Sequence, residues 1–166
     1  MSDTAPHTKK SRGANPKLRR AARMAVIQAL YQMELSNEPS KIVIRQFLDH
    51  RFGHEDEPDM VRVDEGFFEN VALGTVEFQD EIDAKITEKL SDKWPLRRLN
   101  MTLRALLRAA SYEILHRPDI PALVIISEYV TLADQFFDGK EPAMANGILD
   151  AIAKSVRPVE FGVIDG

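Results

Sequence analysis

The sequence contains no cysteine, and this absence excludes several kinds of chemistry and stabilisation. Disulfide cross-links, a thiolate nucleophile and a cysteine-based zinc site are all ruled out. No apolar stretch approaches the length of about 18 residues that crosses a bilayer as a helix. The N-terminal segment MSDTAPHTKKSRGANPK also lacks the apolar run of a secretory signal peptide. Together these absences predict a soluble protein of the cytoplasm without membrane contact.

Motifs typical of enzymes and metalloproteins are missing as well. The chain has no Gly-rich phosphate loop and no G-x-S-x-G pattern, and DEPDMVRVDE lacks the alternating oxygen ligands of a calcium loop. Of the four histidines, only His50 and His54 have helical ligand spacing, but Gly53 lies between them, where a helix is expected to end. The sequence therefore predicts no enzyme, no cofactor and no metal site.

Positive charge, by contrast, is concentrated at the N-terminus. The chain has 22 Lys and Arg against 26 Asp and Glu, yet residues 1–23 hold seven of these cations and a single acid, Asp3. This segment carries +6, whereas the remainder, with 15 cations and 25 acids, carries −10. Such asymmetry is typical of a protein with a polyanionic partner. The alternative is a solvated tail that only aids solubility, and residues 1–14 are expected to form a flexible basic arm.

The first periodic segment has clear signals for the start of a helix. Asn15 suits the N-cap and Pro16 suits the first helical position. Apolar residues then recur at spacings of three and four, which predicts an amphipathic helix of about twenty residues. These residues are Leu18, Ala22, Val26, Ala29 and Met33.

Further helical periods follow along the chain. Ser40 precedes a short helix that Gly53 stops, and a single long helix is predicted from Asp64 to Ile86. Within it, Gly74 marks either a break or a point where a neighbouring helix approaches closely. A leucine-rich helix then ends at HRPDIP, because proline cannot sit inside a helix.

The C-terminal part also predicts helices. The run ALVIIS has the composition of a buried strand, but a helical period continues for four turns through Leu123, Ile126, Val130, Ala133 and Phe137, so its length favours a helix. A last helix is expected between Pro142 and Arg157. With no alternating strand pattern, the sequence predicts one all-α domain of about seven helices over residues 15–157, with a short tail at 158–166.

One face of the first helix suggests contact with nucleic acid. Arg20, Arg23, Ile27 and Tyr31 are spaced three, four and four, so they lie along one side. Guanidinium groups contact phosphates, and an aromatic ring can stack on an unpaired base. The alternative for Tyr31 is a half-buried packing residue with its hydroxyl at the surface. Arg104 and Arg108 share a face of the leucine-rich helix and are interpreted as surface charges or a second RNA contact.

Four segments, in order, resemble the NusB family of bacterial transcription antitermination factors. RRAARMAVIQALYQMELS resembles the family's opening helix, LLRAASYEIL its Leu-Arg-x-Ala-x-Tyr-Glu-Leu helix, DIPALVIISEYVTLADQF its D-[IV]-P-x-x-V-x-I-x-E segment, and ANGILDAIAK its VNGVLDKIA ending. The resemblance covers about residues 19–154. It implies two packed three-helix units, no catalysis, and binding of boxA-type single-stranded RNA together with NusE, a small-subunit ribosomal protein, in an RNA polymerase antitermination complex.

The resemblance also implies which residues form the two sites. The RNA-binding residues carried over or inferred from charge are Lys17, Arg19, Arg20, Arg23, Tyr31, Arg108, Met144 and Asn146. Those for the protein partner are Leu103, expected at the exposed edge of the leucine stripe, and Arg104.

The chain departs from the family pattern at several of these positions. Leu103 stands where the family usually has Glu, Asp134 where it has Lys, and Ala143 and Met144 where it has Lys and Phe. The last two changes remove a charge and a stacking platform. Two other interpretations stay open: a helical adaptor or homodimer with an incidental basic arm, and the accessory domain of an RNA-modifying enzyme, which the lack of a methyl-donor loop disfavours.

Overall fold

A computed structural model describes residues 15–53 and 61–163 of the chain, and within these ranges the protein is all-helical. Seven α-helices and two 3₁₀ turns occur in the described part, and its one β feature is an isolated bridge between Phe52 and Val61. The predicted fold class is confirmed. The elements are α2 (Pro16–Ser36), α3 (Ser40–His50), α4 (Glu65–Glu77), α5 (Gln79–Lys89), η1 (Leu96–Arg98), α6 (Met101–His116), α7 (Ala122–Phe136), α8 (Glu141–Val156) and η2 (Pro158–Phe161).

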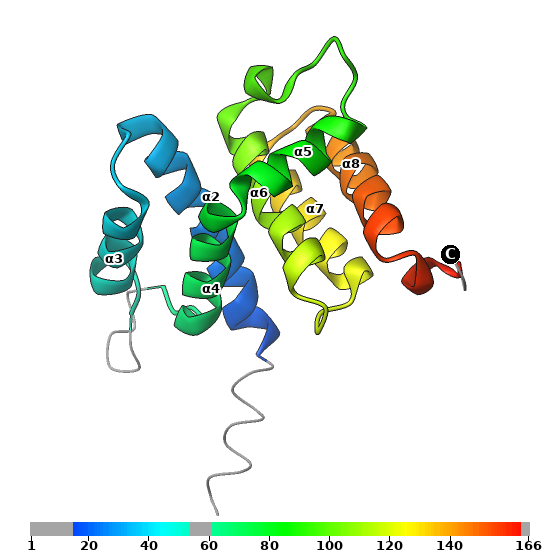
Figure 1. The fold of residues 1–166 in the computed structure, drawn as a ribbon. Coiled ribbons are helices and arrows are strands. Elements are labelled where there is room, and N and C mark those ends of the chain that lie inside the picture. The colour runs from blue at the N-terminus through cyan, green and yellow to red at the C-terminus, as the bar shows by residue number, and fades with distance from the viewer. Residues whose placement is uncertain (1–14, 54–60, 164–166) are drawn as a thin grey trace, which may run out of the picture.

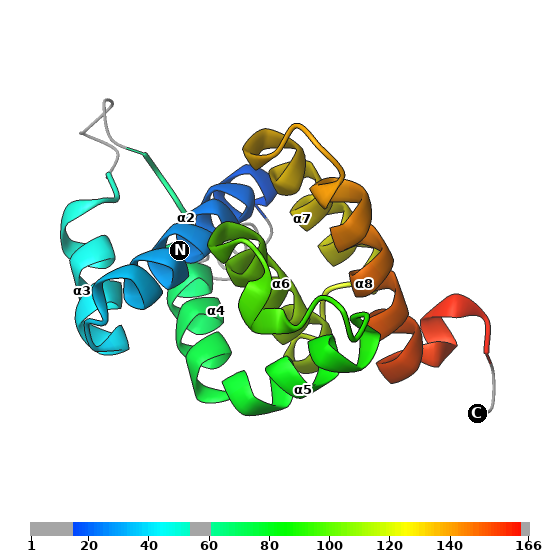
Figure 2. The ribbon, with the colours of Figure 1, turned by 90° about the horizontal axis from the view of Figure 1, so that it is seen from above.

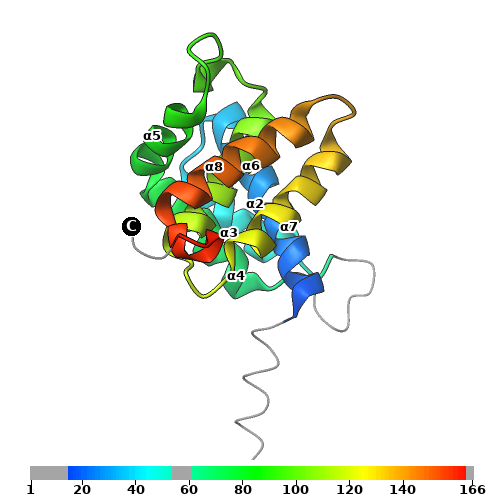
Figure 3. The same ribbon diagram turned by 90° about the vertical axis from the view of Figure 1, so that its right-hand side faces the viewer.

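The helices form two groups that meet along α2 and α6. Helices α2, α3 and α4 pack against one another, as do α6, α7 and α8, with α5 lying against α6 and α8. Figure 1 shows the first group on one side of the molecule and the second on the other, and Figure 2 shows α6 between them. In Figure 3, α7 and α8 run side by side across the second group. This arrangement is the predicted pair of three-helix units.

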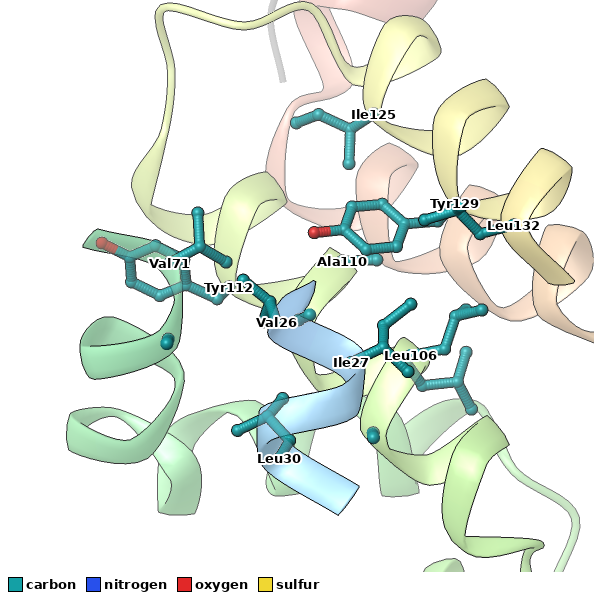
Figure 4. Packing of buried hydrophobic residues seen from close by; sticks show 14 of the residues in the cluster. Val26, Ile27, Leu30, Val71, Leu106, Ala110, Tyr112, Ile125, Tyr129 and Leu132 are labelled. Carbon is teal, nitrogen blue, oxygen red and sulfur yellow. The ribbon is translucent and has the colours of Figure 1, made fainter. Parts of the chain in front are cut away.

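The start of α2 follows from its sequence. The Asn15 side chain accepts a hydrogen bond from the backbone N–H of Leu18 at 3.0 Å, and Pro16 occupies the first turn, as predicted. Apolar residues of α2 then face α6 and α7. Figure 4 shows Val26 and Ile27 of α2 near Leu106 of α6 and Tyr129 of α7 in the shared core.

The single helix predicted from Asp64 to Ile86 is wrong, because the chain breaks it into α4 and α5 at Phe78. Phe78 leaves helical geometry, with φ −103° and ψ 23°, and its ring stacks 4.1 Å from that of His116. Gly74 is inside α4 and marks a close approach instead: a Cβ there would lie 2.2 Å from the ring of Tyr112. Interhelical aromatic packing, which periodicity does not report, sets the break.

Helix α7 is present where ALVIIS predicted it, but its buried face is displaced from the predicted one. Leu123, expected in the core, is 63% exposed. The buried residues are Ala122, Ile125, Ile126, Tyr129, Leu132 and Ala133. Tyr129 turns inward because Glu113 of α6 accepts a hydrogen bond from its hydroxyl, so a polar residue serves as a core residue here.

The segment after α8, predicted as a tail, is partly built into the fold. Residues 158–161 form η2, and the Glu160 carboxylate accepts a hydrogen bond from the backbone N–H of Ala122 at 2.8 Å, which caps the start of α7. The Arg157 guanidinium donates to the backbone oxygens of Ile114 and Ile120 nearby. Residues 158–161 therefore anchor the second helix group. The predicted arm at 1–14 and His54 lie outside the described residues.

Candidate nucleic-acid interface

The two arginines at the start of α2, Arg19 and Arg20, each lie beside a carboxylate from another part of the chain. Arg19 lies 3.6 Å from Asp64, just before α4. Arg20 donates from Nε and Nη2 to the two oxygens of Glu128 on α7, at 3.0 and 2.9 Å. Lys17 is exposed one turn earlier. The predicted basic face therefore exists at Lys17, Arg19 and Arg20, but its arginines are paired within the protein.

The ion pair of Arg20 and Glu128 is partly exposed, and each group stabilises the charge of the other. The Arg20 side chain is 49% exposed and that of Glu128 17%. The hydrogen bond from Arg20 holds the pKa of the Glu128 carboxyl below its usual value. In turn, Glu128 raises the pKa of the Arg20 guanidinium. Both groups are thus charged at neutral pH.

Arg23 is not a surface residue, so its predicted contact with RNA is wrong. Its side chain is only 4% exposed and forms a two-pronged ion pair with fully buried Glu113, at 2.8 Å for both hydrogen bonds. Burial acts to lower the pKa of Arg23, but the hydrogen bonds and charge of Glu113 outweigh it and raise that pKa. The Tyr129 hydroxyl donates to the same carboxylate at 2.5 Å. Arg23 joins the two helix groups from inside.

Tyr31 lies at the rim of a hollow beside the C-terminal half of α2. The hollow has a volume of about 370 Å³ and is lined by Ile27, Gln28, Tyr31, Gln32, Leu35, Arg51, Thr102 and Phe136. Tyr31 is 37% exposed and Phe136 of α7 36%, so two aromatic residues border one cavity. Arg51 adds a positive charge and packs its guanidinium 4.3 Å from the ring centre of Phe47. The hollow combines aromatic, cationic and amide groups, which are those that bind an unstacked base.

Phe136 and Arg51 were missed by sequence reasoning. Phe136 is the last residue of α7, and Arg51 comes directly after the end of α3. Nothing in the local pattern of either distinguishes it from an ordinary helix end. Only the packing of α3 and α7 around α2 places them at Tyr31.

Of the two residues predicted on α8, only one is plainly at the surface. Asn146 is exposed. Met144 is half-buried and lines a second hollow of about 480 Å³, together with Trp94, Arg98, Leu99, Asn100, Leu103, Lys140, Glu141 and Ala143. Met144 thus belongs with Leu103 and Trp94, whereas Tyr31 lines the other hollow.

Leu103 and Arg104 are both buried, which corrects the prediction that Leu103 is exposed. Leu103 is 2% exposed and forms part of the wall of the second hollow, whereas Trp94, also in its lining, is 50% exposed. Arg104 is 6% exposed; its Nη1 donates to three backbone oxygens, including that of Leu99 at 2.8 Å, and its Nη2 pairs with Glu34. Arg104 therefore holds the segment before α6 in place, and the reading of it as a surface charge is wrong.

Arg108 also has a structural partner. Its Nε and Nη2 donate to the carboxylate of Asp83 on α5, at 2.8 and 2.9 Å, and its side chain is 17% exposed. This ion pair ties α5 to α6. Because its guanidinium is oriented toward Asp83, Arg108 is not among the RNA contacts that we propose.

Across residues 15–53 and 61–163, no group of three or more His, Asp or Glu side chains is placed to hold a metal ion. None of the helices in the same ranges combines the length and apolarity needed to span a bilayer. The fold and its two aromatic-bordered hollows define a small all-helical binding module.

Comparison with known proteins identifies the family of this module. The family model described as the NusB family matches residues 20–154. The transcription antitermination protein NusB of Maricaulis maris is 47% identical over 146 residues, covering 87% of this chain and 91% of that protein. That of Caulobacter vibrioides is 46% identical, covering 84% and 94%. This chain belongs to the NusB family.

Solved structures agree with the fold. A structure of T. maritima NusB is 31% identical, with a TM-score of 0.73 and coverage of 87% of this chain and 97% of that one. A chain in a crystal structure of the antitermination factors NusB and NusE in complex with dsRNA has the same fold, with a TM-score of 0.71, 21% identity and coverage of 85% and 99%.

Proposed function

We propose that this protein is a non-catalytic, cytoplasmic transcription antitermination factor that binds boxA-type single-stranded RNA together with NusE. Membership of the NusB family supports the role, and the structure of NusB and NusE in complex with dsRNA supports NusE and RNA as the two kinds of partner. The observation that carries the proposal is the hollow beside α2, where half-exposed Tyr31 and Phe136 meet Arg51.

The RNA path follows α2 from its start to this hollow. Lys17 and Arg20 are exposed at the N-terminal end and contact phosphates, which fix the position of the strand but carry little sequence information. An unpaired base enters the hollow and stacks on Tyr31 or Phe136. Gln28, Gln32 and Thr102 supply amide and hydroxyl groups that can hydrogen-bond the edge of that base. Exposed Asn146 of α8 is a further proposed contact.

Replacing Tyr31 with Ala tests the hollow. If the ring stacks on a base, the substitution weakens binding of a boxA-type RNA by roughly 1–3 kcal/mol, with little change in the dependence on salt. Tyr31→Phe keeps the ring and serves as the matched control, with near-parental affinity. Fluorescence anisotropy with labelled RNA, with NusE present, measures both. Unchanged affinity in Tyr31→Ala would exclude the hollow as the base site.

NusE is proposed to bind at the second hollow, between η1 and the start of α8. Leu103, assigned to this contact by resemblance, lines the hollow. Buried Arg104 holds the segment before α6 by donating a hydrogen bond to the backbone oxygen of Leu99. The exposed group is Trp94, over whose ring the Lys140 ammonium lies 5.9 Å from the centre. Half-exposed tryptophans are frequent anchors of protein interfaces. The contact assigned to Leu103 is therefore better carried by Trp94.

Replacing Trp94 with Ala tests this surface. If the indole is an anchor, the affinity for NusE falls by at least about tenfold, equivalent to roughly 1.4 kcal/mol. Calorimetry with purified NusE measures the change, and circular dichroism checks that helix content is kept. Tyr31→Ala is the control and should bind NusE as the parent does. Parental affinity in Trp94→Ala would show that NusE binds elsewhere.

The same exposed tryptophan favours one second candidate, a helical adaptor or homodimer whose basic arm is incidental. In that case Trp94 packs against a second copy of the chain in a homodimer interface. Sedimentation velocity of the parent and of Trp94→Ala distinguishes this from the proposed function, because only a homodimer dissociates on substitution in the absence of NusE.

A further inference from the structure

Four charged side chains form a continuous series from the core to the surface. Glu113 is fully buried and pairs with Arg23 at 2.8 Å. Arg23 Nη1 lies 3.8 Å from Glu128, and Glu128 binds Arg20 with two hydrogen bonds. The signs alternate, so the series has no net charge. Its outer end, the Arg20 guanidinium, is the member that solvent and ligands reach most readily.

We propose that Glu128 competes with RNA phosphates for Arg20 and so limits the affinity of the basic face. The inference rests on the proposed function and concerns the regulation of its RNA site. Glu128 occupies the edge of the guanidinium formed by Nε and Nη2, which is one of the two edges that bind a phosphate with paired hydrogen bonds. A phosphate must displace Glu128 there, or bind at the other edge with a carboxylate close by.

The competitor is fixed in place and charged. Glu128 sits between two arginines, one buried and one half-exposed, and it is itself largely covered. Arg23 cannot turn away to release it, because both of its hydrogen bonds to Glu113 lie in the core. Arg23 thus adds a second positive charge that favours the position of Glu128 beside Arg20, which an acid on an exposed surface would lack.

The pair also changes how binding depends on salt. Each phosphate that a cation neutralises on a single strand contributes about −0.7 to the slope of log affinity against log salt. Arg20 paired with Glu128 carries no net charge toward the strand. Removing the charge of Glu128 restores one cation, so the slope should steepen by about 0.7.

The experiment compares the full chain with Glu128→Gln in salt titrations, with a boxA-type RNA oligonucleotide and, separately, with long-chain inorganic polyphosphate. We expect Glu128→Gln to bind both polyanions about two- to fivefold more tightly at low salt, with the steeper slope. Glu88→Gln removes the same charge from an exposed position on α5 and is the matched control for net charge. Glu128→Asp keeps the charge and should show no steepening. Circular dichroism checks the fold of each variant.

A double variant separates competition from a general change in charge. In the Arg20→Ala background, Glu128→Gln should give no more gain than Glu88→Gln does. Equal or weaker binding of polyphosphate by Glu128→Gln, or the same gain with Arg20 absent, overturns the proposal. A gain with polyphosphate in a protein that binds no RNA in any form supports the competition while rejecting the proposed function.

Discussion

Arg23→Ala is expected to lower the free energy of unfolding by about 3–5 kcal/mol, because it leaves the carboxylate of Glu113 without its partner in the core. Glu113 is fully buried, and its two oxygens accept hydrogen bonds from Arg23 at 2.8 Å. The hydroxyl of Tyr129 would be its main remaining donor. Urea unfolding followed by circular dichroism measures the change.

The partner substitutions make this prediction specific. Arg20→Ala, which removes a half-exposed guanidinium three residues earlier, should cost less than about 1 kcal/mol. Replacing Arg23 and Glu113 together by Leu should recover part of the loss, because no uncompensated charge is then buried. A cost below 1 kcal/mol for Arg23→Ala would mean that water or a rearranged side chain compensates Glu113.

Arg23 also illustrates where sequence reasoning ends. Its spacing from Arg20 correctly placed both on α2, and the helical periods correctly gave the all-α fold and the cap at Asn15. Helical spacing, however, indicates only the face of the helix on which a side chain lies. It does not indicate which residue of another helix that side chain contacts. The partner of Arg23 is Glu113, 90 residues further along the chain. A cation of the predicted basic face is therefore a core residue, because its counter-charge lies in the core.

The candidate sites show the same limit. Tyr31 is predicted from its spacing along the same face of α2 as Arg20, and in the structure it lines a hollow. Phe136 and Arg51 complete its hollow, but they reach it only through the packing of three helices. At the second hollow, Leu103 is predicted at the exposed edge of its stripe, yet it is buried, and Trp94 is the exposed residue of the lining instead. Contacts between distant segments decide these positions.

Phe68→Ala is expected to cost about 3–5 kcal/mol, because it removes the centre of the aromatic cluster that attaches α3 to α4. Phe68 is fully buried; its ring stacks on that of Phe47 with centres 5.7 Å apart and meets the edge of Phe52 at 4.9 Å. An alanine there leaves a cavity in the first helix group. Thermal and urea unfolding measure the loss, and Phe68→Leu, which fills most of the space, should cost less than about 1.5 kcal/mol.

The cavity should also loosen one part of the fold more than the other. Helix α3 packs on α2 and α4 through Phe47 and carries Arg51 at its end, whereas α8 lies in the other helix group. Hydrogen exchange of the α3 amides should therefore accelerate more than that of the α8 amides, since local opening follows local loss of packing. Because Arg51 lines the hollow at Tyr31, RNA affinity should fall as well in Phe68→Ala, even at temperatures where the chain is folded. Equal acceleration in α3 and α8 would show that the two groups unfold as one unit. Parental RNA affinity in Phe68→Ala would show that the aromatic cluster does not determine the geometry of the RNA site.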